Sequence, residues 1–439
     1  MALSNGKLLL LLGLFLPSMV MAREWYVKPT ARLRAQYNDN LLLRQKPVNG
    51  KIPEAYGYQA TLLGVGGVRS ELSNIALTAE LDVHRYWGQK NLDRENWTVG
   101  LDSDYSLTER SKLGLDASYI SDTTLTGQLD AAANLTPGVD DTTGILAGSL
   151  EGRQIGRKSF NIAPSWNYLL SETKSVNATY GHQEVSYDNA LGNIGSLRDY
   201  KTDSVELAYS EQWSASTRYN VSFNALHYVI TDFDTKNYSL TFGIEHKYSD
   251  TLGFNFFAGV RKTDTEAARQ LYGSANGNQF FIDGDRPTTE QLASEAVYGP
   301  LFGAGLTKQF ERAAVSFNYM RSTNPSGIGL LLVSDAINAN ASYKLTEHLN
   351  FMLSGTARFS AGAGSNGSND FNSNYYSLGP TLSWVFSKQL SLNGGYNYQT
   401  QQYDNAVLRG NAISNGDAIS NSYFVYFDYH LDDLTSNRF

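Results

Sequence analysis

The feature that most constrains this chain is a strict alternation of apolar and polar residues over long runs. In "STRYNVSFNALHY", the apolar residues Tyr219, Val221 and Phe223 alternate with polar neighbours, and the pattern recurs in "NYSLTFGIEHKY" and "LSLNGGYNY". Successive side chains of a β-strand point to opposite faces, so each run is typical of a strand with one apolar and one polar face. No window fits the helical period of 3.6 residues as well.

The length of the runs selects among all-β folds. They extend over about 12 to 16 residues, whereas a strand of a soluble protein usually has about 5 or 6. A tilted strand crosses the hydrocarbon of a membrane with about 9 to 11 residues. The chain is rich in aromatic residues and has no cysteine, so an exported β-sandwich or propeller would also suit its composition. The strand length favours the transmembrane β-barrel.

The connectors between the runs come in two lengths. Short polar turns are predicted near Glu71, Thr108, Ser171, Gln212, Ser249, Phe310, Thr346 and Ser387. The two longest connectors are predicted over residues 123–154 and 265–298. Short turns at one end and long loops at the other are the pattern of a transmembrane barrel. We therefore predict an all-β fold, a single-chain antiparallel barrel of about 18 strands, or about 16 if the pair with the glycine-rich "LLGVGGV" fails, with both termini periplasmic.

The first residues predict the compartment. Lys7 precedes a short apolar run that ends in Val20-Met21-Ala22, which is the pattern of a secretory signal peptide. Residues 1–22 are therefore expected to be this leader and residues 23–439 the barrel, placed in the cell outer membrane of a Gram-negative bacterium. The partners implied are outer-membrane lipid and the barrel insertion machinery. The aromatic last run, "SYFVYFDYHL", is followed by a polar tail, "DDLTSNRF", which ends in Phe439.

The tryptophans provide an independent test of the barrel. None falls in the middle of a predicted strand, and an indole favours the membrane interface because it has an apolar body and a polar N–H. The predicted aromatic girdle consists of Trp25, Trp87, Trp97, Trp166, Trp213 and Trp384.

Charged residues on the polar faces predict the pore lining. An Arg or Lys that faced lipid near the bilayer centre would cost about 2–4 kcal/mol, so these side chains are expected to face the interior. A barrel of this size leaves a channel unless loops plug it, and the segments 123–154 and 265–298 are candidates to narrow the pore or to remain outside it. The candidate pore-lining residues are Glu80, Asp82, Asp116, Glu206, Arg218, Glu245 and Arg358.

The residue types for catalysis or metal binding do not gather in the sequence. The six histidines are scattered over separate runs, and only His84 shares a face with carboxylates, those of Glu80 and Asp82. No catalytic, cofactor or metal site is expected. The net charge of -8 argues against a nucleic-acid partner, because nucleic-acid binding depends mainly on basic residues.

Two segments carry a resemblance to a known family. "WYVKPTARLRAQYNDNLLL" and "RSTNPSGIGLLLVSDAINANASYKLTEHLNF" resemble the outer-membrane β-barrel porins associated with exopolysaccharide/exosortase (PEP-CTERM) loci. That family shares an N-terminal W-x-(x)-P and Y-x-D-N segment, a P-S-G-x-G loop followed by S-D, and L-[ST]-E turns. The matching positions are Trp25, Pro29, Tyr37, Asp39, Asn40, Pro325, Ser326, Gly327, Gly329, Ser334, Asp335, Leu345, Thr346 and Glu347.

The resemblance implies a role in polysaccharide secretion, with polysaccharide and periplasmic export components as partners. The leading hypothesis is a passive outer-membrane conduit for polysaccharide export. A general or sugar-selective diffusion porin is the main alternative. Two further alternatives are a barrel enzyme that acts on lipid or a surface substrate, and a structural barrel whose outer loops bind a surface polymer or protein.

Overall fold

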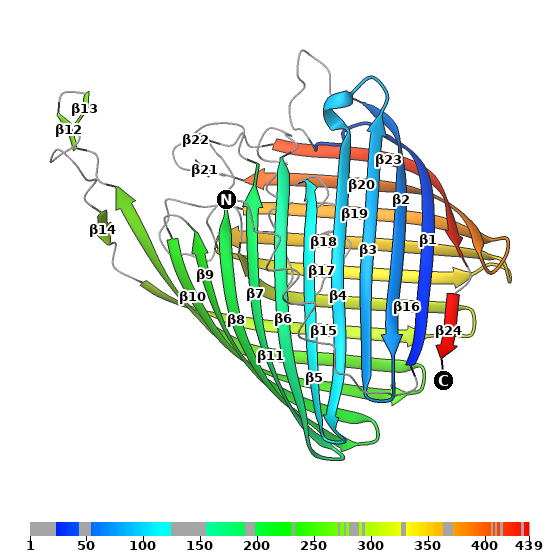
Figure 1. The fold of residues 1–439 in the computed structure, drawn as a ribbon. Helices are drawn as coiled ribbons and strands as arrows, with labels where there is room; N and C mark the ends of the chain where they lie inside the picture. Colours follow the sequence, from blue (N-terminus) through cyan, green and yellow to red (C-terminus); the bar gives the residue numbers. More distant parts are fainter. Residues whose placement is uncertain are drawn as a thin grey trace.

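In the computed structural model the chain forms one closed antiparallel barrel of 18 strands (Figure 1). The structure describes residues 23–43, 54–123, 155–188, 198–230, 233–270, 273–275, 278–280, 289–291, 295–325, 331–362, 372–404, 407–408, 411–412, 416–431 and 434–438. The predicted leader, most of the segment 123–154 and Phe439 lie outside these residues. No helix in the described part of the chain is long and apolar enough to cross a bilayer.

The barrel strands follow one another around the wall in chain order. They are β1 (Arg23–Asn38), β2 (Ala55–Arg69), β3 (Ser73–Tyr86), β4 (Arg94–Thr108), β5 (Ser111–Thr123), β6 (Gly156–Ser171), β7 (Lys174–Tyr187), β8 (Tyr200–Ser214), β9 (Thr217–Ile230), β10 (Phe233–Ser249), β11 (Leu252–Gln270), β15 (Glu295–Gln309), β16 (Ala313–Pro325), β17 (Leu331–Lys344), β18 (Leu349–Gly362), β19 (Asn372–Val385), β20 (Leu390–Asp404) and β23 (Gly416–His430). The short elements outside the wall are the 3-10 helix η1 (Lys90–Leu92), β12 (Gly273–Ala275), β13 (Asn278–Phe280), β14 (Thr289–Gln291), β21 (Val407–Leu408) and β22 (Asn411–Ala412).

The barrel closes where the two ends of the chain meet. β1 pairs with β23 from Thr30↔His430 to Asn38↔Ser422. Below this stretch, β1 pairs instead with a short last strand, β24 (Leu434–Arg438) (Figure 1). Part of the predicted polar tail is therefore a strand of the closing seam, because β1 begins seven residues before its first partner in β23 and offers unpaired backbone groups there.

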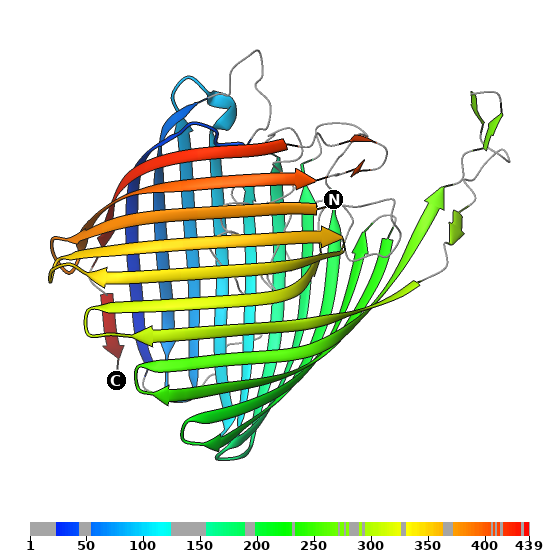
Figure 2. The same ribbon diagram turned by 180° about the vertical axis from the view of Figure 1, so that it is seen from behind.

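Eight short turns lie at one end of the barrel, here the turn end, and connectors of more varied length, most of them longer, lie at the other, the loop end (Figure 2). In six of these turns a Ser or Thr hydroxyl oxygen accepts a hydrogen bond of 3.0–3.1 Å from the backbone N–H three residues later. This side-chain bond stabilises a tight reversal, which explains why the same small polar connector recurs along the chain. The capping residues are Ser70, Thr108, Ser214, Ser249, Thr346 and Ser387.

Three predicted boundaries differ from the structure. The turn predicted near Gln212 lies at residues 215–216, because the outward Trp213 continues the strand to the capping Ser214. The glycine-rich run is part of the full-length strand β2, so the count of 16 is wrong. The connector predicted over residues 265–298 begins as a strand, because β11 continues to Gln270 and pairs there with β14. Figures 1 and 2 show β11 and β14 projecting beyond the barrel rim, so these strands do not enter the lumen.

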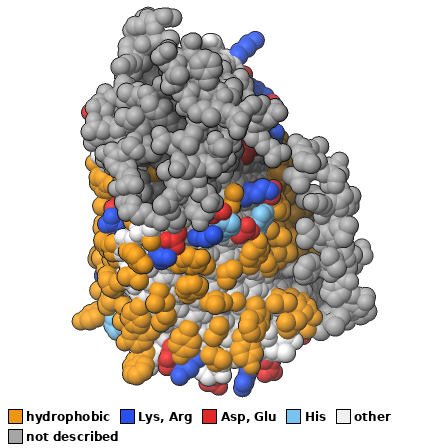
Figure 3. Space-filling view, turned by 90° about the vertical axis from the view of Figure 1, so that its left-hand side faces the viewer, with side chains coloured by type: hydrophobic (Ala, Val, Ile, Leu, Met, Phe, Trp, Pro, Cys, Tyr) orange, Lys and Arg blue, Asp and Glu red, His pale blue; other side chains and the backbone are white. Residues whose placement is uncertain are grey.

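The alternation in the sequence separates the outer and inner surfaces of the wall. Large apolar side chains such as Leu33, Leu62, Phe223 and Leu240 lie on the outward face and are exposed. Figure 3 shows a band of hydrophobic side chains over one face of the barrel, with charged side chains above the band and others below it. Since the outward face of such a barrel contacts lipid, this exposed apolar surface is the one that the bilayer covers.

The charged side chains above the apolar surface form what we call the loop-end belt. They project outward from the strand ends, and their ion pairs include Lys201 Nζ–Glu184 Oε1 at 2.6 Å and Lys262 Nζ–Asp264 Oδ2 at 2.8 Å. The belt consists of Arg85, Glu95, Lys158, Asp188, His182, Glu184, Lys201, Asp203, His227, Asp234, Lys262, Asp264, Arg321 and Asp335.

Phe223→Arg is expected to lower the free energy of unfolding by about 2–4 kcal/mol, because it places a cation in the lipid at the middle of β9. Asn224→Arg is the matched control, since Asn224 faces inward opposite Glu206 and an arginine there stays in the aqueous interior. Urea unfolding in lipid vesicles measures both. Equal destabilisation by the two variants would contradict the assignment of the faces.

Candidate functional site: the barrel lumen

All seven predicted pore-lining residues lie on inward positions of the wall. Directly opposite partners share a face, and these residues pair with other inward polar residues, as in Thr61↔Asp82 and Gln212↔Arg218. The four in the turn half, Asp116, Glu206, Arg218 and Glu245, are exposed. Asp82 and Arg358, nearer the loop end, are buried, and Glu80 is half-buried. That these residues line a conducting pore remains a prediction.

The exposure of the inward side chains changes along the barrel axis. In the turn half, polar residues such as Asp102, Asn318 and Asn340 are exposed. In the loop half, inward residues such as Arg94 and Gln401 are buried, at 6% and 0% exposed. Among the described residues, the inward side chains of the loop half are thus less accessible than those of the turn half, and we call the loop half the constriction.

One described part of this constriction is the segment that follows β1. Asp39 accepts hydrogen bonds from the backbone N–H and the side-chain amide of Asn421 on β23, both at 2.7 Å. The Asn40 amide donates to the carbonyl of Ile419 at 2.9 Å. Leu43, only 2% exposed, then packs against Tyr375 of β19 and Ala418 of β23. The segment Asp39–Leu43 thus crosses the inner face of the wall at the loop end, and we call it the mouth segment.

A row of inward side chains crosses β1 to β4 within the constriction. Arg34 lies opposite Gln59, Gln59 opposite His84, and His84 opposite Arg94. Neighbouring strands are about 4.8 Å apart, so these four side chains form one continuous row across the inner face of the wall. We call Arg34, Gln59, His84 and Arg94 the arginine row.

Neither arginine of the row forms an ion pair with a described carboxylate. The Arg34 guanidinium lies 4.1 Å from the ring centroid of Phe424, and its Nε is buried without a hydrogen-bond partner. Arg94 reaches the hydroxyl of Tyr86 at 3.5 Å and Nε2 of His84 at 3.4 Å. Two cations that make no ion pair with the described residues make the arginine row electropositive, because charges interact strongly where water is scarce.

The next row toward the turn end holds charges of both signs in pairs. Arg32 Nε donates to Asp428 Oδ1 at 2.6 Å. Asp82 accepts hydrogen bonds from Gln59 at 2.9 Å and from the Thr61 hydroxyl at 2.8 Å, and its other oxygen lies 2.6 Å from His84 Nε2. These pairs neutralise one another. Of these two rows, the arginine row thus carries the excess positive charge.

The cluster of Glu80, Asp82 and His84 does not have the geometry of a catalytic site. A nucleophilic hydroxyl must be within hydrogen-bond reach of its base, but the Thr61 hydroxyl donates to Asp82 rather than to the imidazole. The remaining ring nitrogen of His84 is buried without a partner. Within the described ranges, no group of three or more His, Asp or Glu residues could hold a metal ion.

A buried ion pair fixes the wall beside the arginine row. Arg157 of β6 donates to Asp122 of β5 through Nε at 2.8 Å and through Nη2 at 2.6 Å. Their side chains are 8% and 4% exposed. Such a two-bond contact holds both side chains in one geometry.

The opposite wall, β16 to β20, carries mostly uncharged polar side chains on its inward face. The Thr356 hydroxyl donates to Asn338 Oδ1 at 2.7 Å, and the Ser377 hydroxyl donates to Asn397 Oδ1 at 3.0 Å. Amides and hydroxyls oriented in this way suit hydrogen bonding to a hydroxylated solute. We call this surface the amide wall; its inward members include Asn318, Asn338, Asn340, Thr356, Ser377, Asn393, Asn397 and Gln399.

The six tryptophans are exposed on the outside of the barrel near its ends. Trp25, Trp166, Trp213 and Trp384 lie near the turn end, with the Trp166 indole N–H donating to the Ser111 hydroxyl at 2.9 Å. Trp97 lies near the loop end of β4, and Trp87 lies in the turn after β3. Their role as membrane anchors remains a prediction.

The closed barrel and its exposed apolar surface define the class of this protein. It is an outer-membrane β-barrel of a Gram-negative bacterium, because only a closed barrel satisfies every strand hydrogen bond in lipid.

Comparisons with known proteins add no closer assignment. No protein-family model and no curated protein matches the sequence. Solved structures with a similar arrangement include the open form of the ferric-catecholate import receptor Fiu from E. coli K12, at 9% identity and a TM-score of 0.46 over 92% of this chain and 81% of that chain. OccAB3 of Acinetobacter baumannii has 12% identity and a TM-score of 0.45 over 93% and 99% of the two chains. OpdL of Pseudomonas aeruginosa has 11% identity and a TM-score of 0.43 over 92% and 99%. These similarities are too low to carry an argument about function.

Proposed function

We propose that the barrel is a passive outer-membrane channel for saccharides, and that its cargo is a polysaccharide on its way out of the cell. The observation that carries this proposal is the amide wall. A saccharide presents hydroxyl groups in every direction, and a row of amides and hydroxyls exchanges hydrogen bonds with such a chain without holding it through charge.

The direction of transport and the length of the cargo depend on the resemblance to barrels of exopolysaccharide loci. In this orientation the turn end and both termini lie in the periplasm, and the open half of the lumen receives the polymer. The constriction and the mouth segment then control its exit. Lipid and the insertion machinery remain the expected partners of the barrel, and periplasmic export components are the expected partners of its turn end.

A general diffusion porin is the second candidate, and the paired charges beside the amide wall favour it. Charges of both signs facing one another, as in Arg32–Asp428, orient water and slow apolar solutes without selecting a saccharide. In this case small solutes would enter through the same lumen, and no exported polymer would depend on the protein.

The channel is expected to conduct ions in planar bilayers and to admit neutral oligosaccharides in a liposome-swelling assay. Asn318→Leu together with Asn340→Leu is expected to slow oligosaccharide entry about fivefold while ion conductance changes little, because two hydrogen-bonding groups are lost at similar volume. The outward variant Phe317→Leu is the control and should behave like the parent protein.

The outcomes separate the proposals. Absence of both conductance and swelling in the parent protein would reject the channel. Conductance with equal oligosaccharide entry in parent and variant would favour the general porin. Deletion of the gene followed by measurement of secreted polymer tests the export direction, and unchanged secretion would contradict it.

A further inference from the structure

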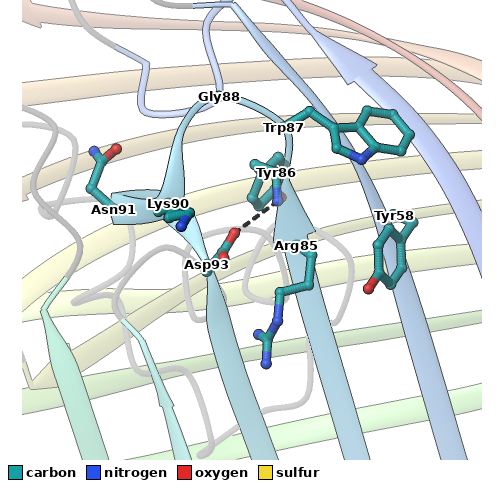
Figure 4. Close-up of a pocket in the computed structure, with 8 residues that line it drawn as sticks. All are labelled: Tyr58, Arg85, Tyr86, Trp87, Gly88, Lys90, Asn91 and Asp93. Carbon is teal, nitrogen blue, oxygen red and sulfur yellow. Dashed lines mark hydrogen bonds between the residues drawn. The ribbon is translucent and has the colours of Figure 1, made fainter.

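An open recess lies on the outside of the barrel at the loop end, beside the loop-end belt (Figure 4). It has a volume of about 630 Å³ and lies between the ends of β2 and β3 and the turn that contains η1. The Tyr86 backbone N–H donates to Asp93 Oδ1 at 2.8 Å, which holds this turn against β3. The recess is therefore a shaped part of the outer surface and not a part of the lumen.

The lining of the recess combines aromatic rings with two cations, Arg85 and Lys90, and one carboxylate, Asp93. The rings of Tyr58 and Trp87 have centroids 6.4 Å apart, and Trp87 is 65% exposed. Arg85 projects from β3 beside them, and its guanidinium pairs with Glu95. Lys90 of η1 is exposed and makes no ion pair within the described residues. Exposed rings of this kind stack on the C–H face of a sugar, and Lys and Arg bind phosphate oxygens.

The height of the recess fits a membrane headgroup. Trp97 and Leu81, outward residues a few positions below it on β4 and β3, belong to the exposed apolar surface that lipid covers. The recess and the belt thus lie at the level of the headgroups of the leaflet at the loop end. The belt presents carboxylates as well as cations there. Carboxylates suit a layer of phosphates bridged by divalent cations, because they supply oxygen ligands to those cations.

We propose that this recess, with the adjoining belt, binds the phosphorylated sugar headgroup of a glycolipid in the surrounding leaflet. Trp87 and Tyr58 contact the sugar ring, while Lys90 and Arg85 bind the phosphate. The site is on the outer wall, so the proposal does not depend on whether the lumen conducts.

The test uses the full-length protein in nanodiscs, with lipid retention and exchange measured by native mass spectrometry. The probes are bisphosphorylated lipid A, monophosphorylated lipid A, phosphatidylglycerol and inorganic phosphate. The parent protein is expected to bind bisphosphorylated lipid A at least about tenfold more tightly than phosphatidylglycerol, because only the glycolipid engages both the rings and the cations. Trp87→Leu should weaken binding of both forms of lipid A about tenfold. Lys90→Gln should weaken the bisphosphorylated form more than the monophosphorylated form.

The control variants lie at the other end of the barrel. Trp166→Leu and Lys174→Gln remove an outward indole and an outward lysine near the turn end, where no such effect is expected. Lys90 is an exposed residue of a short turn, so Lys90→Gln tests the site even if Trp87→Leu fails to fold. The proposal is overturned if lipid A and phosphatidylglycerol bind equally, if inorganic phosphate competes at comparable concentration, or if the control variants lose as much binding as the recess variants.

Discussion

Replacing Arg34 and Arg94 with glutamine is expected to lower the ratio of anion to cation permeability of the channel about fivefold. Each unpaired charge at about 8 Å from a passing ion contributes roughly 0.5 kcal/mol even in water, and two of them act together in the arginine row. The reversal potential across a planar bilayer with a salt gradient measures this ratio. The expected change is toward cations, because the carboxylates of the neighbouring row stay in place.

Arg218→Gln is the matched control for the arginine row. Arg218 also faces inward, but it lies in the open turn half and is exposed to solvent, where salt screens its charge. Its removal should leave the reversal potential almost unchanged. If Arg218→Gln shifts the potential as much as the double variant, the constriction does not determine ion selectivity. A parent protein without conductance would instead contradict the proposed channel.

Asp122→Leu is expected to lower the free energy of unfolding by about 3–5 kcal/mol. The change removes the carboxylate that the buried guanidinium of Arg157 contacts through two hydrogen bonds, and breaking a buried ion pair by removing one partner is costly. Urea unfolding of the barrel in lipid vesicles measures the difference at equal denaturant slope.

The comparison is with an exposed pair of similar geometry. Glu184→Leu removes the partner of Lys201 at the loop end, where the two side chains are 38% and 62% exposed. An exposed pair contributes at most about 1 kcal/mol, so this variant should remain close to the parent protein. Comparable losses in the two variants would show that burial does not set the strength of the Asp122–Arg157 pair.

Most of the barrel could be predicted from the sequence because strand faces are a local property. The alternation within each strand indicates which of its residues point to lipid and which point inward. The inward placement of Asp116, Glu206 and Glu245 therefore follows from alternation alone. Alternation does not predict a strand where neither of its two faces contacts lipid or the barrel interior. Beyond the rim, β11 continues through the polar "TEAARQ", and no alternation marks it as a strand.

The arginine row could not be predicted, although each of its members lies on a polar face. Its four residues come from separate strands, and their common height depends on cross-strand register that the turns and loops set together. Which of the inward side chains are buried could not be predicted either, because burial also depends on segments that come together only in the fold. Alternation assigns Asp82 and Asp116 to the same inner surface, yet the first is buried in the constriction and the second is exposed.

The position of the turn after β8 does have a signal in the sequence. Ser214 precedes its turn as Ser249 and Ser387 precede theirs, and a hydroxyl three residues before the next strand would have placed the turn correctly. The Y-x-D-N segment is a second sequence signal with a structural role. Asp39 and Asn40 hold the mouth segment on β23, so this motif forms a contact between the two ends of the chain.

The closing seam has a consequence for how the barrel forms. The pairing of β1 with β23 joins residues as far apart as Thr30 and His430, 400 positions along the chain, so it costs more chain entropy than the pairing of two consecutive strands. Until it forms, β1 and β23 are both free edges with unpaired backbone groups, which lipid cannot satisfy. A chain in which β23 has not yet paired with β1 therefore has no stable place in a bilayer, and this one pairing decides whether all the other strands become a membrane protein.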